Sequence, residues 1–479
     1  MLVKSFTISP AGILRLIFLL IFILPVLLPY PCQASLYVEG VFMGKVTPEM
    51  TPEEVIHRYP ITRDFFTHYN MKKFTRKPLC GEPLARGAAA FSIQPDTLAE
   101  ELNRFLKANE NNKPRENPIK AFQAVWFAMV MSTGIVSIAS LRVAGLYHGE
   151  VFSDILRGFA YALFWINVAA YPVMVIMKLS RCAAFWKEVV ADLSNPKTCL
   201  TFFTIVAGTN VLGAQIAIFG YYEIAKIFWY WGLFLWVLIT ISTFSFLFIK
   251  GISPLEESIN GGWLLATVGT QSVAVLGSII APYYIKHGYF IFFLSYVWWL
   301  IGCFLYIIIM TLVMHRLIFF KLNPKELVPP YWINMGAVAI TTLAGALLVL
   351  NGMKLQRGLG ELMSFTRGFT FFFWAFGTWW IPLLVVLGFW KYIFRRTKPV
   401  FNPAYWGMVF PLGMYTACTY QLAYAMDLYF LLHIPKYFWF FAITAWVLTF
   451  IWTWAFIAKP RKKLLYPARN AFLSLKRER

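Results

Sequence analysis

Ten long apolar segments recur along the chain between residues 118 and 459, and they constrain the fold more than any other feature. A stretch of about 20 apolar residues is long enough to cross the hydrocarbon core of a bilayer as a helix. The breaks between the segments are short and polar, which leaves no room for a large soluble domain among them. We therefore predict an all-α membrane protein with ten transmembrane helices, in agreement with a mean hydropathy of +0.62.

The ten predicted spans alternate between two kinds of helix. The odd-numbered spans are rich in Gly, Ala, Ser and Thr, and we place them at 120–141, 199–219, 261–282, 332–350 and 405–426. The even-numbered spans are bulky and aromatic, and we place them at 155–177, 228–248, 290–314, 369–390 and 437–457. The third and fifth spans share a Gly-Thr-amide signature, Gly208-Thr209-Asn210 and Gly269-Thr270-Gln271, which indicates that helical hairpins of one kind are repeated.

The small residues of the odd spans leave two interpretations open. Small residues can simply allow transmembrane helices to approach closely. Alternatively, the five odd helices line an axis and the bulky helices face lipid. No Asp, Glu, Lys or Arg lies in the interior of the spans as placed, so a proton relay is not indicated. A neutral path of hydroxyl and backbone groups, entered from basic mouths, suits small anions.

The formal net charge of +21 comes from 43 Lys and Arg against 22 Asp and Glu. These cations gather in loops and in the basic tail, where they orient spans and meet anionic lipid, so we expect the lipid bilayer and no nucleic acid as a partner. Far more of them fall on one side of the ten spans than on the other. The bias predicts a multi-pass protein of the cell (plasma or inner) membrane with both ends of the ten-helix body in the cytoplasm.

Neither a catalytic site nor a metal or cofactor site is indicated. The six cysteines have no close pair, and the six histidines do not fall at the spacing of metal ligands. The predicted spans hold no cluster of titratable groups that a membrane enzyme would need. We therefore expect no enzyme activity, no catalytic residues, no metal and no cofactor.

The chain divides into five regions. Residues 1–42 are apolar and resemble a signal or anchor, although a translation start at Met43 is also possible and agrees better with the charge bias. Residues 43–112 predict a small helical domain, in which Thr51, Pro52 and Glu54 form a helix start with a capping box. A second helix should begin at Pro95. Residues 113–118 are a linker, 119–459 the ten-helix transporter or channel domain, and 460–479 a basic cytoplasmic tail.

Two resemblances to known families add to these expectations. The pattern VTPEMTPEEVIHRYPITRDFFTHYNM resembles a small helical domain of unknown function that is found with redox and iron–sulfur-cluster repair proteins. The segments WFAMVMSTGIVSIAS, FFTIVAGTNVLGAQ and WGMVFPLGMYTACTYQLA resemble the tellurite-resistance/dicarboxylate transporter family, which includes slow anion channels. This second resemblance implies five hairpins around a central pore, usually in a homotrimer, which carry monovalent anions, sulfite, tellurite-type oxyanions or four-carbon dicarboxylates such as malate.

The resemblance also implies a gate. In that family a phenylalanine in a Trp-x-x-x-Phe-Pro motif of the ninth span blocks the pore, and Phe410 holds that position here. As pore-lining residues we expect Thr133, Thr209, Thr270, Thr342 and Gly413. The predicted function is channel-like transport of small anions, and the alternative is a proton-coupled dicarboxylate carrier.

Overall fold

The structure is a computed structural model that describes residues 46–458, apart from 60–61, 69–70, 72–73, 75–81, 90–92, 109–116, 148–149, 252–257, 323–326, 328, 356–359 and 398. The described residues fall into two compact units, one before Ile119 and one at Ile119–Ala458. Within these ranges every regular element is helical. Our expectations for 1–42 and for the basic tail lie outside the described residues.

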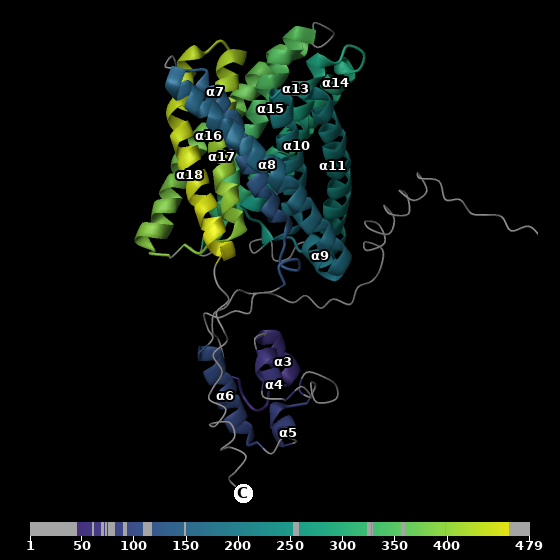
Figure 1. Ribbon diagram of the computed structural model, residues 1–479, viewed down its shortest axis with the longest axis vertical. Coiled ribbons are helices and arrows are strands. Elements are labelled where there is room, and N and C mark those ends of the chain that lie inside the picture. The colour runs from purple at the N-terminus through teal and green to yellow at the C-terminus, as the bar shows by residue number, and fades with distance from the viewer. Residues whose placement is uncertain are drawn as a thin grey trace, which may run out of the picture. The chain divides into compact units, whose positions relative to one another are not determined.

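The larger unit contains ten long helices in five hairpins (Figure 1). The first helix of each hairpin begins with a 3-10 turn, and these pairs are η4 (Ala124–Phe127) with α7 (Ala128–Ala144), η5 (Cys199–Phe202) with α10 (Phe203–Ile218), η6 (Gly261–Leu264) with α13 (Leu265–Ile280), η8 (Pro329–Trp332) with α15 (Ile333–Leu355), and η10 (Pro403–Tyr405) with α17 (Trp406–Ala425). The second helices are α8 (Glu150–Ala184), α11 (Tyr222–Lys250), α14 (Gly288–Phe319), α16 (Gly360–Phe389) and α18 (His433–Ala458). Short elements join them, namely α9 (Trp186–Leu193), η7 (Ala281–Tyr283), the π-helical turn η9 (Trp390–Phe394) and η11 (Tyr429–Leu432).

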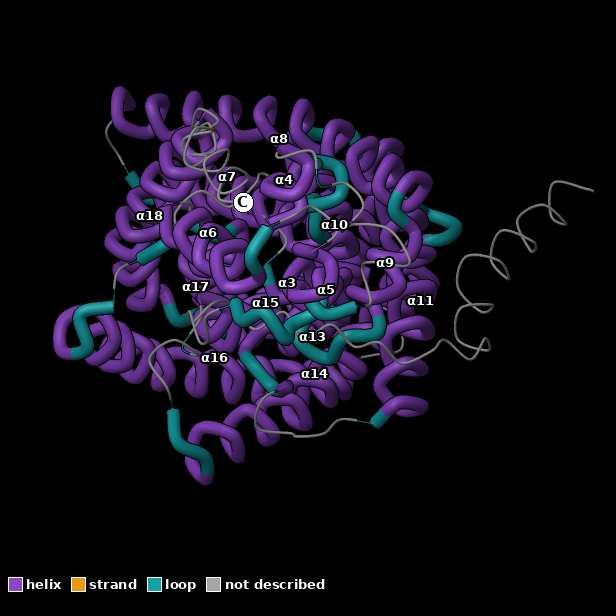
Figure 2. Tube along the Cα trace, turned by 90° about the horizontal axis from the view of Figure 1, so that it is seen from below, coloured by secondary structure: helices purple, strands orange, loops and turns teal. Residues whose placement is uncertain are grey.

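The first helices of the five hairpins form a closed inner ring. Each of α7, α10, α13, α15 and α17 contacts the next in this order, and α17 returns to contact α7. The second helices pack around the outside, each against its own inner partner. In Figure 2 the labels of the five inner helices lie inside those of the five outer helices. Because every inner helix is followed by an antiparallel outer one, all five inner helices run in the same direction.

Composition explains which helices are inside. An apolar helix without a polar face is stable when protein surrounds it, and 94% of the most apolar window of η6 and α13 is buried. In η11 and α18 only 22% is buried, and the exposed side chains are large and apolar, as a lipid-facing surface requires. Nine of the ten long helices of the larger unit have the length and hydropathy of a membrane span, and α17 is the exception. This helix can be less apolar because it belongs to the inner ring, where it contacts α15, α7 and α18. The predicted fold class is confirmed.

The predicted spans differ from the helices mainly at the ends of the outer series. We placed the second span at 155–177, whereas α8 has 35 residues. At 1.5 Å per residue this helix is about 52 Å long, more than the hydrocarbon core of roughly 30 Å, so it must project or tilt. The extra turns carry charged residues that a hydropathy pattern assigns to loops.

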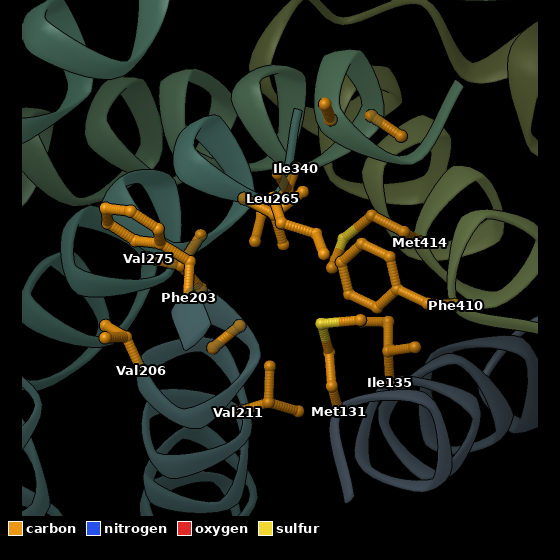
Figure 3. Packing of buried hydrophobic residues seen from close by; sticks show 14 of the residues in the cluster. Met131, Ile135, Phe203, Val206, Val211, Leu265, Val275, Ile340, Phe410 and Met414 are labelled. Atoms are coloured by element: carbon orange, nitrogen blue, oxygen red, sulfur yellow. The ribbon is translucent and has the colours of Figure 1, made fainter. Parts of the chain in front are cut away.

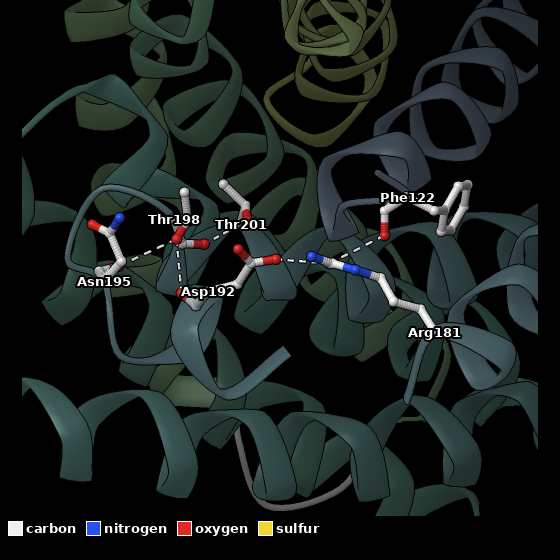
Figure 4. Close-up of polar contacts among 6 residues, drawn as sticks. All are labelled: Phe122, Arg181, Asp192, Asn195, Thr198 and Thr201. Atoms are coloured by element: carbon white, nitrogen blue, oxygen red, sulfur yellow. Dashed lines mark hydrogen bonds and ion pairs between the residues drawn. The ribbon is translucent and has the colours of Figure 1, made fainter. Parts of the chain in front are cut away.

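One of these charged residues, Arg181, is buried near the end of α8 (Figure 4). Its guanidinium donates hydrogen bonds to the backbone oxygen of Phe122, at 3.2 Å, and to the carboxylate of Asp192, at 2.7 Å. The hydroxyl of Thr198 in turn donates to the backbone oxygen of Asp192. Arg181 therefore ties α8 to α9 and to the segment that leads into η4, and its charge is compensated by a single carboxylate.

The smaller unit contains α3 (Pro52–Arg58), α4 (Thr62–His68), α5 (Leu84–Ala89) and α6 (Pro95–Ala108). The predicted start of α3 is confirmed: the Thr51 hydroxyl accepts from the Glu54 backbone N–H, and the Glu54 carboxylate accepts from that of Thr51. The second predicted helix is α6, and its apolar face packs with Phe65 and Phe66 in a core of its own. The segment that contains Cys80 is outside the described residues.

Candidate functional site

A narrow cavity lies inside the inner ring, toward the end where the inner helices finish. We call it the central cavity; all five inner helices line it with Ile135, Ile138, Arg142, Asn210, Val211, Ala214, Ile218, Ser272, Val275, Ile279, Ile340, Leu343, Leu347, Met414, Ala417 and Gln421. The volume that the centre of a water molecule can reach is about 30 Å³. This volume holds no more than a few water molecules, so the cavity is closed to a free flow of ions in this state.

Helical spacing decides which side chains reach the cavity. The lining residues of α17 are Met414, Ala417 and Gln421, at steps of three and four, so they share one helix face. The lining residues of α15 and α7 follow the same spacing. We expected walls of hydroxyl and backbone groups, whereas most of the lining side chains are aliphatic.

Phe410 lies one turn before the cavity on the same face of α17, four residues before Met414. It is fully buried. Figure 3 shows its ring directed into the space between the inner helices, near Met131 and Met414. Met131 of α7 and Leu265 of α13 are also buried around this space, and we call Met131, Leu265 and Phe410 the apolar plug. The plug lies next to the cavity, on the side of the N-terminal ends of the inner helices.

A glycine on α15 makes room for the Phe410 ring. Gly336 lies one turn before the cavity-lining Ile340. A Cβ atom at Gly336 would be 3.0 Å from Cδ1 of Phe410 and 2.9 Å from Cγ of Pro411. These distances are shorter than ordinary van der Waals contact, so any larger residue at 336 would push against the ring.

Three of the threonines that we expected in the pore contact outer helices instead. The Thr133 hydroxyl accepts from Trp446 of α18 at 3.0 Å, and the Thr270 hydroxyl accepts from Trp236 of α11 at 2.7 Å. The Thr209 hydroxyl is hydrogen-bonded to the Tyr171 hydroxyl of α8 at 2.8 Å. None of the three is among the residues that line the central cavity.

The other two expected residues, Thr342 and Gly413, are also buried but do not line the central cavity. The Thr342 hydroxyl donates to the backbone oxygen of Val338 within α15, at 2.9 Å. A Cβ atom at Gly413 would be 3.0 Å from Cγ2 of Ile135 and 3.1 Å from Cγ2 of Val136. Gly413 thus permits the close approach of α17 to α7 that closes the ring.

The contacts of the threonines belong to a set that repeats around the ring. In each hairpin an aromatic side chain of the outer helix is hydrogen-bonded to the inner helix of the next hairpin, and the fifth hairpin is bonded to the first. The five pairs are Tyr171 with Thr209, Trp236 with Thr270, Trp299 with the backbone oxygen of Thr341, Trp374 with Thr419, and Trp446 with Thr133. We call them the five aromatic contacts. In each contact, the hydroxyl or carbonyl of the inner helix has its partner on an outer helix, away from the axis.

Arg142 is a cavity-lining residue that the sequence analysis missed. We ended the first span at residue 141, whereas α7 continues to Ala144 and places Arg142 in its last turn. The expectation that no charged residue lies within a span is therefore wrong for this helix. Arg142 lines the cavity with Ile135 and Ile138, at the spacing of one helix face, and that spacing is the signal that could have revealed it.

The ring carries little formal charge along its axis. The sequences of the five inner helices contain no Asp or Glu. Their N-terminal ends, which carry partial positive charge, lie together beyond the apolar plug, and their C-terminal ends lie toward the central cavity. Among the described residues no group of His, Cys, Asp and Glu could hold a metal ion. The arrangement suits the passage of a small ion.

A ring of five buried parallel helices inside a lipid-facing layer, with a closed cavity on its axis, defines a membrane transport protein or channel. The model of the voltage-dependent anion channel family matches residues 121–458, which is most of the chain, and the protein belongs to that family. The resemblance drawn from the span motifs is thereby confirmed. The protein is a multi-pass membrane protein of an anion-transporting family.

Individual relatives agree with this class. An uncharacterized transporter of Methanocaldococcus jannaschii is 29% identical over 308 residues, which cover 63% of this chain and 85% of the relative. A sulfite efflux pump of Arthroderma otae is 25% identical over 344 residues, covering 66% of this chain and 86% of the pump. An uncharacterized membrane protein of Mycobacterium tuberculosis is 38% identical over 149 residues, covering 31% of this chain and 74% of the relative.

Proposed function

We propose that small anions pass along the axis of the inner ring and that Phe410 is the gate. The observation that carries this proposal is the position of Phe410, fully buried one turn beyond the cavity on the cavity-facing side of α17. Met131 and Leu265 complete the apolar plug around it. Movement of the Phe410 side chain would open the plug and connect the cavity to the N-terminal ends of the inner helices.

An apolar constriction can close a pore without filling it completely. Water leaves a narrow space lined by hydrocarbon, and an ion would have to lose its hydration shell to enter. Apart from Arg142, the walls on the cavity side hold only weakly polar groups, so most of the lining does not bind an anion strongly. These properties favour channel-like conduction that is limited by the gate.

Sulfite is the substrate that we propose first, because relatives named as sulfite efflux pumps align with most of the transport domain. Four-carbon dicarboxylates such as malate, tellurite-type oxyanions and monovalent anions are the other candidates. We further propose that the protein forms a homotrimer with one pore per protomer in the cell membrane, with both ends of the ten-helix body in the cytoplasm. Native mass spectrometry and accessibility labelling of engineered cysteines test these two points.

The gate is tested with Phe410→Ala in liposomes that contain the purified protein. We expect sulfite flux to increase about tenfold or more, which corresponds to roughly 1.4 kcal/mol removed from the barrier. The matched control is Phe373→Ala on α16, because Phe373 is equally buried but packs against Tyr306 and Phe369 away from the axis. Both variants should lose stability. Equal flux in wild type and Phe410→Ala, with the same amount of folded protein inserted, would refute the gate.

A proton-coupled dicarboxylate carrier is the competing mechanism. Carriers that move protons usually use an acidic or histidine side chain within the membrane, and the inner helices contain no Asp, Glu or His. An imposed pH gradient across the liposome membrane separates the two mechanisms. Accumulation of malate against its own gradient, driven by protons, would show that the protein is a coupled carrier.

A further inference from the structure

Arg142 differs from every other residue that lines the central cavity, because it is the one ionisable side chain in that lining. It comes from the last turn of α7, where a cation is favoured by the helix dipole. Gln421 of α17 lines the same cavity and lies a little more than one turn before the end of its helix. Arg142 and Gln421 therefore line one small cavity from two neighbouring helices.

One donor of the guanidinium is left unused by the described residues. Its Nε atom is buried and has no hydrogen-bond acceptor among them. The ionisable neighbours that act on Arg142 are the phenols of Tyr283 and Tyr420, which are neutral at pH 7. By contrast, buried Arg181 is paired with Asp192 at 2.7 Å. Arg142 is half-buried, so a cation there without a carboxylate partner carries part of the cost of desolvation, and an anion in the cavity would offset it.

The direction of the inner helices gives Arg142 an electrostatic role. All five inner helices point their C-terminal ends, which carry partial negative charge, toward the side of the cavity. An anion that enters from this side meets an unfavourable potential unless a positive charge compensates it. Arg142 supplies that charge within the lining itself.

We propose that Arg142 and Gln421 form a binding site for a small oxyanion, a site that rests on the proposed anion path along the axis. The planar guanidinium donates two parallel hydrogen bonds to a pair of oxygens on one atom, as in sulfite, nitrate or a carboxylate. The Gln421 amide can donate to a third oxygen. A spherical halide cannot use the fork in this way, so the site selects oxyanions over chloride.

The first test measures binding without transport. The melting temperature of the purified protein is followed against the concentration of sodium sulfite, and separately of sodium chloride, at constant ionic strength. Hydrogen bonds to charged groups contribute enough that Arg142→Gln should weaken sulfite binding roughly tenfold to a hundredfold. The matched control is Arg157→Gln, because Arg157 is exposed on outer helix α8 and paired with Asp154. Sulfite binding should be unchanged in this control. Equal sulfite binding by Arg142→Gln and wild type would overturn the site.

The second test uses Arg142→Lys, which keeps the charge and removes the fork. This variant should still bind anions through its charge but lose the preference for sulfite over chloride. A wild-type preference for sulfite in Arg142→Lys would overturn the bidentate recognition. The gate can fail independently: if Phe410→Ala leaves flux unchanged while Arg142→Gln loses sulfite binding, the oxyanion site stands and the gate falls.

Discussion

The contact between Gly336 and Phe410 predicts a variant that opens the pore without altering the gate residue. In Gly336→Ala the new methyl group would lie 3.0 Å from the Phe410 ring and 2.9 Å from Pro411. Carbon atoms prefer separations of about 3.5–4.0 Å, so the ring must move by a few tenths of an ångström. Overpacking of this kind costs roughly 1–3 kcal/mol.

The expected effect on flux follows from which state carries this strain. If the ring leaves Gly336 on opening, the strain raises the free energy of the closed state alone. Each 1.4 kcal/mol then changes the ratio of open to closed protein tenfold, so anion flux should rise by roughly fivefold to a hundredfold. Liposome flux of sulfite, normalised to the amount of inserted protein, measures the change.

Two comparisons make this prediction specific to Phe410. Gly377→Ala on α16 introduces an even closer contact, 2.6 Å from Cγ1 of Val338, but away from the axis, and should leave flux unchanged. In a Phe410→Ala background, Gly336→Ala should have little further effect, because the ring that it displaces is gone. An increase of equal size with and without the Phe410 ring would refute the reasoning.

Two further predictions concern contacts outside the axis. Thr133→Val should reduce the free energy of unfolding by roughly 1–3 kcal/mol, because it leaves the buried N–H of Trp446 without an acceptor. It should lower the melting temperature and leave the ratio of sulfite to chloride flux unchanged. A changed flux ratio would show that Thr133 lines the pore. Asp192→Asn should cost about 2 kcal/mol, because buried Arg181 loses its charged partner. The exposed pair of Asp154 and Arg157 supplies the control, and a melting temperature of Asp154→Asn as low as that of Asp192→Asn would contradict the role of burial.

The sequence allowed the architecture to be predicted because the bilayer imposes a length and a polarity on each span. The alternation of small and bulky helices identified the inner and outer series, including α17, whose hydropathy alone is too low. The ends of the outer helices could not be placed in this way. A residue such as Arg181 looks like a loop charge in the sequence, whereas the structure shows it buried and paired with Asp192 of the next helix.

The orientation of the inner helices about their own axes was harder to predict. We predicted hydroxyl groups as the lining of the anion path, whereas the hydroxyls of Thr133 and Thr270 accept hydrogen bonds from tryptophans on outer helices. These hydrogen bonds join residues that are far apart in the chain, with a separation of 313 residues between Thr133 and Trp446, so no local sequence pattern predicts them. Phe410 was identified through the family resemblance alone. Arg142 was missed because the hydropathy pattern ended the first span too early.

The five aromatic contacts give the ring a direction, since every hairpin is bonded to the one that follows it. The last of them joins Trp446, near the end of the transport domain, to Thr133, near its beginning. During synthesis, the first hairpin must therefore wait in the membrane with an unused acceptor until the fifth has been inserted. A chain that stops before α18 leaves Thr133 without this partner and the seam between α17 and α7 uncovered on its outer side.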